Sequence, residues 1–354
     1  MGSGHDAVAA ELARRARALG HEARTVDVLG LLPHGLGTAL RHGYGAAVRS
    51  FPWAYALVYR ALLRRGPGRR PSGVPLARLA GERLRDLVEG GRADVVVPVF
   101  HLAAQLTGDL RSRGRLGVPS VVLLIDFAVH RQWLHPGNDR YLCVTEDSAR
   151  VVREDIATAA EAVGPVVAPE FFAPSGEAAA RWSECFARRA PDRVPVLLSA
   201  GAWGAGSRLP GTARLLAAHG YLPVVLCGRN ERLRRGLRGI PGALALGWVD
   251  DMPALMRAAG ALVDNAAGQT AVQALATGLP VVGYRPLPGH GLEGVRRMSA
   301  LGLTDLAHDP PSLLDRLSRA TTPGPDHRHR LARARALFRQ DPLTTILHTC
   351  PPPT

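Results

Sequence analysis

Two side chains in the first half of the chain could take part in proton transfer. His5 lies in the stretch Gly2-Ser3-Gly4-His5, directly before an expected helix over residues 6–19. Its imidazole titrates closest to neutral pH, so it could accept a proton from a hydroxyl group, or it could simply cap that helix. Asp126 follows an expected buried strand. At that position it could orient His5, orient an acceptor, act as the base itself or cap the next turn.

Two further histidines flank a tryptophan shortly after Asp126. His130 and His135 lie on either side of Trp133. A metal ion bound by this pair would need a third and a fourth ligand, which the neighbouring residues do not offer, so no metal site is expected. Two interpretations stay open, the lining of an acceptor pocket and ordinary packing.

Glycine-rich turns follow several expected strands in the second half. Such turns let backbone N–H groups approach a diphosphate, and a helix start is worth about 0.3–1 kcal/mol to an anion. An aromatic ring there could stack on a nucleotide base, worth on the order of 1 kcal/mol. The pattern favours a nucleotide diphosphate ligand, the alternative being plain strand–helix turns. The candidate residues are Gly201, Trp203, Gly204, Arg229, Asn230, Trp248, Val249, Asn265, Gly268, Gln269 and Thr270.

One segment, residues 41–70, is both basic and aromatic. It has no acidic residue, and its seven arginines are Arg41, Arg49, Arg60, Arg64, Arg65, Arg69 and Arg70. It also holds Tyr44, Phe51, Trp53, Tyr55 and Tyr59, five of the eighteen aromatic residues of the chain. This combination favours an anionic membrane surface. Single-stranded nucleic acid is disfavoured because no nucleic-acid-binding motif accompanies it. A solvated basic helix with core aromatics is the alternative.

The elements that must position these residues alternate between strand and helix. Continuous apolar runs predict strands at residues 94–99, 120–125, 140–144, 162–167, 194–199, 222–227, 243–246, 260–263 and 281–284. Helices are expected between them, including residues 208–219, 252–259 and 270–277. Such alternation is typical of parallel sheets covered by helices on both faces. A strand should also precede the first helix, and we expect that the natural chain starts one strand earlier.

Composition limits the class of protein further. The chain has 354 residues and a formal net charge of +14, and all of its basic residues are arginine. A length of this order predicts two domains. No apolar run approaches the ~20 residues of a membrane span. The four cysteines show no CxxC spacing, which favours reduced thiols in the cytoplasm.

Several motifs, in this order, resemble the monogalactosyldiacylglycerol synthase and processive diacylglycerol glucosyltransferase family. In the first half they are residues 2–5 with 9–12, and 126–130 with 133–136 and 139–141. In the second half they are residues 247–253, 263–270, 274–282 and 286–289. The resemblance implies an α/β protein of the GT-B type, in which two Rossmann-like, doubly wound parallel-sheet domains face each other across a cleft. Residues 1–168 would bind the acceptor and residues 169–335 the nucleotide-sugar, while a helix in residues 336–354 packs back on the first domain.

The chain departs from the family at the expected sugar and ribose positions. Gln273 stands where the family carries a glutamate that grips the ribose hydroxyls, a change that costs roughly 1 kcal/mol of charge-assisted bonding. His290-Gly291 replaces a Gln-Glu pair, and Gly294 replaces an asparagine. Ala267-Gly268 replaces a pair of glycines. The donor sugar is therefore left open.

The resemblance implies a hexosyltransferase with His5 as base and Asp126 assisting. It would move a hexose, with inversion, from a UDP-sugar to a diacylglycerol-like hydroxyl, using no cofactor beyond that donor and no metal. The expected location is the cytoplasm, with peripheral attachment to the inner leaflet through residues 41–70. Two alternatives are a nucleotide-sugar-binding protein that has lost turnover and a soluble transferase acting on a small secondary metabolite.

Overall fold

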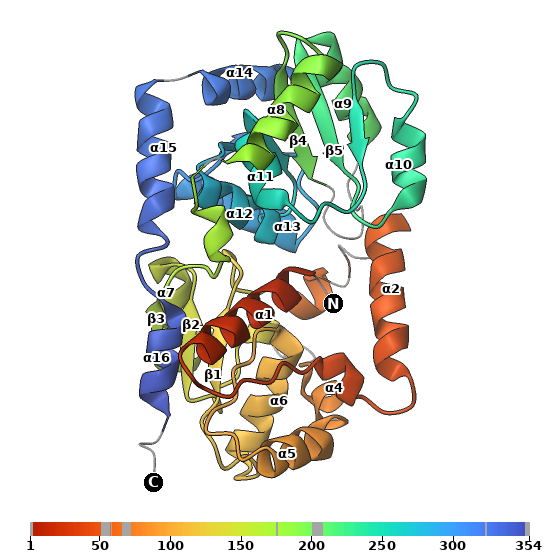
Figure 1. Ribbon diagram of the computed structural model, residues 1–354. Coiled ribbons are helices and arrows are strands. Elements are labelled where there is room, and N and C mark those ends of the chain that lie inside the picture. The colour runs from red at the N-terminus through yellow and green to blue at the C-terminus, as the bar shows by residue number, and fades with distance from the viewer. Residues whose placement is uncertain are drawn as a thin grey trace. The chain divides into compact units, whose positions relative to one another are not determined.

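The computed structural model describes residues 3–50, 57, 59–65, 72–174, 176–199, 208–322 and 324–350, apart from the side chains of residues 47–50 and 326. The chain divides into two compact units, which we describe separately (Figure 1). The N-terminal unit consists of Met1–Ala47, Trp53–Val166 and Leu337–Thr354. The C-terminal unit consists of Val48–Pro52 and Val167–Ala336.

The N-terminal unit is built around a parallel sheet of three strands in the order β1-β2-β3. Its strands are β1 (Val121–Leu124), β2 (Arg140–Cys143) and β3 (Ala160–Ala162). Its helices are α1 (Ser3–Ala18), α2 (Leu36–Ser50), α4 (Val74–Arg78), α5 (Gly81–Gly90), α6 (His101–Ser112), α7 (Glu146–Ile156) and α16 (Pro342–Thr349). Short helical turns are η1 (Val28–Leu31), η2 (Tyr59–Leu63) and η3 (Arg131–Trp133).

Successive side chains of β1 enter two different cores, because a strand turns alternate residues to opposite faces. Val121 and Leu123 pack with α1 and α16. Val122 and Leu124 pack with α6, α7 and Trp133. The sheet is therefore covered by helices on both faces, which explains why β1 is an uninterrupted apolar run.

Two of the predicted strands in this unit are wrong in extent. Residues 94–99 run beside β1, but they form only a single bridge, between Val96 and Ser120. Pro98 accepts a hydrogen bond from Leu123 and has no N–H to donate in return, which interrupts the ladder. The strand predicted at residues 162–167 is instead β3, which ends before Gly164, a residue with φ of +76°.

The C-terminal unit has a six-stranded parallel sheet in the order β6-β5-β4-β7-β8-β9. Its strands are β4 (Val194–Ser199), β5 (Tyr221–Leu226), β6 (Leu244–Leu246), β7 (Ala261–Asp264), β8 (Val281–Tyr284) and β9 (Asp305–Ala307). This order is that of a dinucleotide-binding Rossmann fold, in which ligands bind beyond the carboxyl ends of the strands where the order reverses, here between β4 and β7.

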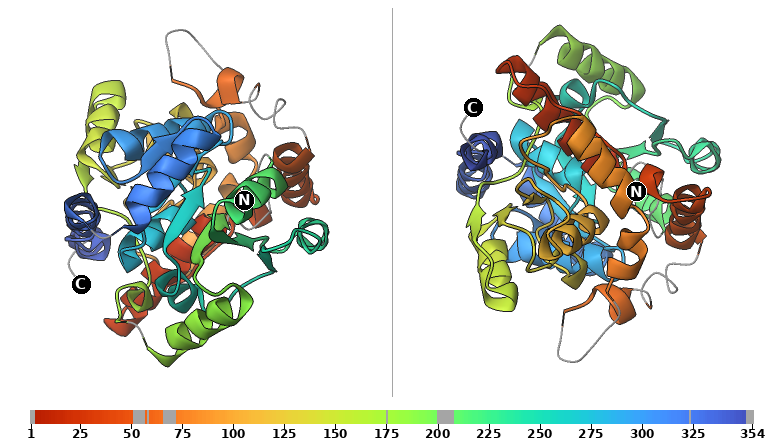
Figure 2. Two further views of the ribbon diagram at one scale, coloured as in Figure 1. Left: turned by 90° about the horizontal axis from the view of Figure 1, so that it is seen from above. Right: turned by 90° about the horizontal axis from the view of Figure 1, so that it is seen from below.

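Helices cover both faces of this sheet (Figures 1 and 2). The helical elements are η4 (Pro169–Phe171), α8 (Glu177–Arg189), α9 (Leu209–Ala218), α10 (Glu231–Leu237), α11 (Met252–Arg257), α12 (Gln269–Thr277), α13 (His290–Ala300), α14 (Pro310–Thr321) and α15 (Pro325–Ala336). Residues of α9, α10 and α14 share one core with β4, β5, β7 and β8. Among the described residues, no helix is both long and apolar enough to cross a bilayer.

Candidate active site

An aspartate–tryptophan pair lies just beyond the end of β1. The indole Nε1 of Trp133 donates a hydrogen bond of 2.6 Å to Oδ2 of Asp126. Trp133 has no exposed surface, whereas the side chain of Asp126 is 16% exposed. The indole therefore holds the carboxylate in one orientation while leaving part of it accessible.

His5 lies in the first turn of α1 and is oriented by the backbone. Its Nδ1 lies 2.7 Å from the carbonyl oxygen of Val99. A carbonyl oxygen can only accept, so Nδ1 carries the hydrogen, and in the neutral ring Nε2 is the atom with the lone pair. The imidazole also packs against Phe100 and Trp133, with ring centroids 5.1 and 6.1 Å away. The structure thus brings His5 and Asp126 to the same tryptophan.

Two more imidazoles surround Trp133. The rings of His101 and His130 lie 6.2 and 6.0 Å from it, and 5.1 Å from each other. Nε2 of His130 is 3.8 Å from Oδ2 of Asp126. Among the described residues, no three side chains of His, Cys, Asp or Glu converge as metal ligands would.

The loop that carries Trp133 is tied to α6 by one buried amide side chain. Nε2 of Gln105 donates to the carbonyl oxygens of Gln132 and Leu134, at 3.0 and 2.9 Å. These two carbonyls flank Trp133 in sequence, so one side chain fixes the backbone on both sides of the indole. Because Gln105 is only 3% exposed, solvent cannot substitute for these bonds.

A second buried network holds the end of the same loop. The hydroxyl of Tyr141 accepts hydrogen bonds from the backbone N–H of His135 and from Nδ2 of Asn138, at 2.8 and 2.9 Å. Burial raises the pKa of Tyr141 to about 12, so the phenol keeps its proton for the carbonyls of Trp133 or His135. Oδ1 of Asn138 accepts from Thr107 at 2.8 Å. The position of Trp133 is therefore set from both ends of its loop.

The described part of the basic segment is partly neutralised by acids from elsewhere in the chain. Arg65 makes two hydrogen bonds of 2.7 Å to Asp155, and Arg41 pairs with Asp27. Tyr59 is only 2% exposed and belongs to the interior. In this segment Arg49's side chain, Phe51, Trp53, Tyr55, Arg69 and Arg70 lie outside the described residues.

In the C-terminal unit, an aspartate shapes the turn that follows β7. Oδ2 of Asp264 accepts hydrogen bonds from the backbone N–H groups of Ala266 and Ala267, at 3.0 and 2.6 Å. Burial is the largest influence on Asp264 and raises its pKa, while these N–H groups act in the opposite direction. Ala267 has φ of +53°, a left-handed conformation that glycine adopts without strain.

The turn leads into α12 and packs against α13. Gly268 is the N-cap of α12, and Gln269, Thr270 and Gln273 belong to its first turns. The carbonyl of Asn265 accepts a hydrogen bond of 2.8 Å from the backbone N–H of Leu287, which ties the turn to the loop before α13.

Two glycines of α13 make this contact close. A Cβ at Gly294 would lie 2.9 Å from the Cβ of Ala267, and one at Gly291 would lie 3.0 Å from the carbonyl oxygen of Asn265. His290 begins the same helix. The changes at positions 267, 291 and 294 therefore lie on one contact between the α12 turn and α13.

A second group follows β5 and β6. The guanidinium of Arg229 lies over the ring of Trp248, 4.7 Å from its centroid, and that ring is half exposed. Nε1 of Trp248 donates to Asp250 at 2.9 Å. Val249 is half-buried, and Oδ1 of Asn230 accepts from the backbone of Leu233, capping α10. The predicted residues Gly201, Trp203 and Gly204 lie outside the described residues.

Sequence reasoning missed the roles of three residues: Gln105, His101 and Asp264. Each acts through contacts between segments that are distant in the chain, or through a turn whose backbone conformation the sequence does not reveal. The one available signal was the position of Asp264, a polar residue at the end of an apolar strand and before a glycine-containing helix start.

Parts of the chain are similar to known glycosyltransferases. Residues 5–167 match the family model for monogalactosyldiacylglycerol (MGDG) synthase. A processive diacylglycerol beta-glucosyltransferase of Bacillus cereus is 28% identical over 244 residues, covering 66% of this chain and 61% of that protein. The chain thus matches less than two thirds of this relative's length.

Solved structures show the same fold at low identity. The glycotransferase of kitacinnamycin has a TM-score of 0.58 at 16% identity, covering 98% of this chain and 96% of its own. HepE of Anabaena, solved with UDP, has a TM-score of 0.51 at 13% identity, covering 76% and 80%. The fold is GT-B, and the chain is similar to monogalactosyldiacylglycerol synthases and processive diacylglycerol glucosyltransferases.

Proposed function

We propose that this protein transfers a hexose from a UDP-sugar to the hydroxyl group of a diacylglycerol-type lipid. The observation that carries the proposal is the fixed tautomer of His5 beside the Asp126–Trp133 pair. The names of the curated relatives support a diacylglycerol acceptor. The UDP and UDP-glucose complexes of HepE support a UDP-sugar donor.

The proposed reaction is a single displacement. Nε2 of His5 takes the proton of the acceptor hydroxyl while its oxygen forms a bond to the anomeric carbon of the donor. The bond from that carbon to the diphosphate breaks, and UDP leaves with the electron pair. Attack from the side opposite the leaving group inverts the anomeric configuration. The negative charge of Asp126, held by Trp133, favours the imidazolium that forms on His5.

The donor would bind at the carboxyl ends of the strands in the C-terminal unit. The start of α12, at Gly268, Gln269 and Thr270, offers backbone N–H groups and the positive end of the helix dipole to the diphosphate. The half-exposed ring of Trp248 is suited to a base, and the neutral amide of Gln273 to the ribose hydroxyls. Asn265 directly follows β7 in this turn, and His290 begins the helix α13 that packs against it.

We further propose that the described part of residues 41–70 contacts the inner leaflet of the cell membrane. Leu57 and Leu62 are 54% and 36% exposed, and the neighbouring Arg60 and Arg64 are also exposed. Apolar side chains beside arginines suit an anionic lipid surface. The paired Arg41 and Arg65 contribute less, because an acid already compensates each charge.

The transfer is tested with purified protein, vesicles containing diacylglycerol, and a panel of nucleotide-sugars, by measuring UDP release. Release that requires both the vesicles and one UDP-hexose is expected. Tight nucleotide-sugar binding without release across the panel would favour a protein that has lost turnover. Release with small soluble alcohols but not with diacylglycerol would favour a transferase of soluble metabolites.

Membrane contact is tested separately by flotation with vesicles of phosphatidylglycerol. The double variant Leu57→Ser/Leu62→Ser should float less than the natural protein, and high salt should weaken flotation of both. Leu79→Ser is the matched control, because Leu79 is 52% exposed and lies outside the segment. Equal flotation of the double variant and the control would contradict this surface.

A further inference from the structure

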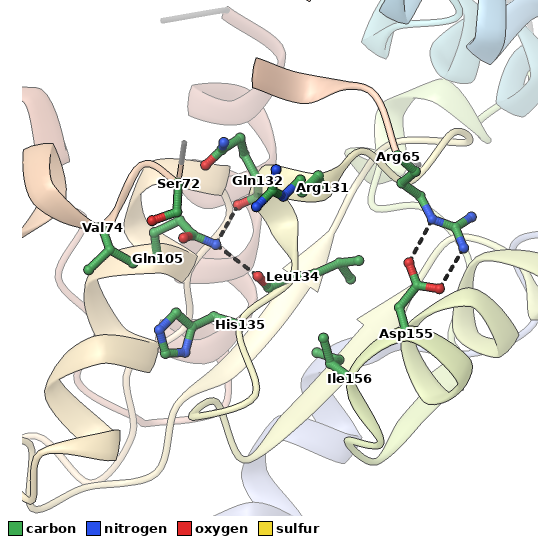
Figure 3. A pocket seen from close by; sticks show the side chains of 10 residues that line it. All are labelled: Arg65, Ser72, Val74, Gln105, Arg131, Gln132, Leu134, His135, Asp155 and Ile156. Atoms are coloured by element: carbon green, nitrogen blue, oxygen red, sulfur yellow. Dashed lines mark hydrogen bonds and ion pairs between the residues drawn. The ribbon is translucent and has the colours of Figure 1, made fainter. Parts of the chain in front are cut away.

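The N-terminal unit contains a pocket of about 610 Å³ that the proposed reaction does not use (Figure 3). The turn η3 separates it from the proposed base. Trp133 of this turn faces Asp126, while Gln132 and Leu134 line the pocket. Arg65 of the basic segment and Ser72, which follows the segment, line it as well. The pocket is therefore adjacent to the proposed catalytic residues but distinct from them.

The amide side chain of Gln105 lines this pocket. Both hydrogens of Gln105 Nε2 are donated to backbone carbonyls, at 3.0 and 2.9 Å. Among the residues that the structure describes, none donates a hydrogen bond to the Oε1 atom of Gln105, although the residue is only 3% exposed. This oxygen can therefore accept a hydrogen bond from a ligand in the pocket.

An imidazole supplies the complementary donor. Nδ1 of His135 accepts a hydrogen bond of 3.1 Å from the backbone N–H of Gly137, so in the neutral ring the hydrogen is on Nε2. Burial lowers the pKa of His135, which keeps the ring neutral at physiological pH. Its ring rests against Gly108, where a Cβ would lie 2.4 Å from Nδ1. Ser72 adds a hydroxyl that can both donate and accept.

The remaining lining combines apolar walls with one ion pair and a further arginine, Arg131. Val74, Leu134 and Ile156 contribute apolar surface. Arg65 and Asp155 neutralise each other through two hydrogen bonds of 2.7 Å, which Figure 3 shows at the opposite side from Gln105. Neutral donors and acceptors next to apolar walls match a sugar ring, which has hydroxyl edges and apolar faces.

Two other ligand classes fit less well. An acyl chain would leave Gln105 Oε1 and the Nε2 hydrogen of His135 without partners in a dry pocket. A phosphate group could pair with Arg131, but its oxygens would meet Gln105 Oε1, which accepts hydrogen bonds and cannot donate them. A hydroxyl group can donate to the amide oxygen and accept from the imidazole at the same time.

We propose that this pocket binds a hexosyl group, either as the headgroup of a glycolipid or as a free sugar. A glycolipid held there would lie next to the turn that carries Trp133. Binding itself depends only on the pocket lining, so it can succeed or fail independently of the transfer reaction.

Isothermal titration calorimetry without any nucleotide-sugar tests the proposal. The probes are octyl β-glucoside below its micelle concentration, glucose, dioctanoylglycerol and glycerol 3-phosphate. The glucoside should bind, and Ser72→Ala/His135→Asn should weaken it about tenfold or more, because two hydrogen bonds are lost. In this variant an asparagine oxygen can still accept from Gly137. The affinity for dioctanoylglycerol should not change.

The two sources of the sugar give different results. Tighter binding of the glucoside than of glucose identifies a lipid-linked headgroup, whereas equal affinities identify the free sugar. Ser183→Ala/His219→Asn, at positions in α8 and after α9, is the matched control and should bind like the natural protein. If the pocket variant does not fold, Ile156→Trp fills the pocket from its wall and should abolish glucoside binding.

Three results would overturn the proposal. They are no measurable glucoside binding, the same affinity in the pocket variant as in the control, and preferential binding of glycerol 3-phosphate. A protein that releases UDP in the transfer assay but gives one of these results retains its proposed function and loses only this site.

Discussion

The contact between the turn after β7 and helix α13 gives a quantitative prediction. Ala267 has φ of +53°, and a Cβ added at Gly294 would lie 2.9 Å from its methyl group. Carbon atoms normally pack about 3.5–4.0 Å apart, so Gly294→Ala creates an overlap of roughly 0.6–1.1 Å. Overpacking of this kind costs about 1–3 kcal/mol, against a gain of about 0.8–1 kcal/mol from alanine in a helix.

Replacing Ala267 with glycine removes the methyl group with which the new side chain would clash. In that background Gly294→Ala should stabilise the protein by about 1 kcal/mol, the helix-propensity gain alone. The two substitutions should therefore couple by about 1–3 kcal/mol in a double-mutant cycle. Ala267→Gly by itself should have a small effect, because relief of left-handed strain is offset by the greater backbone freedom of glycine in the unfolded chain.

Urea unfolding followed by circular dichroism measures the cycle. The unfolding free energies of the single and double variants are compared with one common slope of free energy against urea concentration. Gly291→Ala is the matched control. Its Cβ would meet the carbonyl oxygen of Asn265 and the Cβ of Leu287, each at 3.0 Å, and neither depends on residue 267. Its cost should thus be the same in both backgrounds. Additivity of Ala267→Gly and Gly294→Ala within about 0.3–0.5 kcal/mol would refute the reasoning.

Three further predictions concern the site itself. His5→Asn should lower kcat by about 10²–10⁴ with little change in the KM for the donor, while His21→Asn, an exposed control, should leave both unchanged; an active His5 variant would mean that another group is the base. Trp133→Phe removes the hydrogen bond to Asp126, so kcat should fall more than the donor KM rises in steady-state assays, and an unchanged kcat would contradict the role of that bond. Burial raises the pKa of Asp264, so the folded state binds its proton more tightly than the unfolded chain and loses stability as the pH rises above the ordinary value of 3.8. Asp264→Asn should flatten this part of the profile of unfolding free energy against pH. Parallel profiles for the variant and the natural protein would contradict this role of Asp264.

The sequence predicted the C-terminal sheet well because its strands are continuous apolar runs with clear ends. Five expected strands correspond to β4, β5, β6, β7 and β8 within one or two residues. Because such strands are buried on both faces, they contain few polar residues and form continuous apolar runs in the sequence. Residues 94–99 have the same composition, but Pro98 prevents a regular ladder with β1. An apolar run indicates burial more reliably than it indicates pairing.

The site could be predicted in its residues but not in its connections. His5 and Asp126 can be picked out as candidates in the sequence. That both of them contact Trp133 is seen only in the folded structure. The hydrogen bonds of Gln105 join α6 to the Trp133 loop, and no pattern in the sequence indicates this connection. Likewise, no composition argument could show that Arg65 is already paired with Asp155, which reduces the charge available to a membrane.

The substitutions near α12 show why family patterns alone are insufficient. Read singly, an alanine at 267 and a glycine at 294 are two departures at a binding site. In the structure the methyl group of Ala267 lies against Gly294, which has no side chain to clash with it. The pair is therefore consistent with a preserved turn at the start of α12.

The most direct test of the central proposal is the mass spectrum of the lipid extracted after incubation with diacylglycerol vesicles and UDP-glucose or UDP-galactose. The proposed function predicts a diacylglycerol whose mass has increased by one anhydrohexose, formed in equal amount with UDP and absent with the His5→Asn variant. Release of UDP without any hexosylated lipid, or unchanged lipid with every UDP-hexose tested, would contradict it.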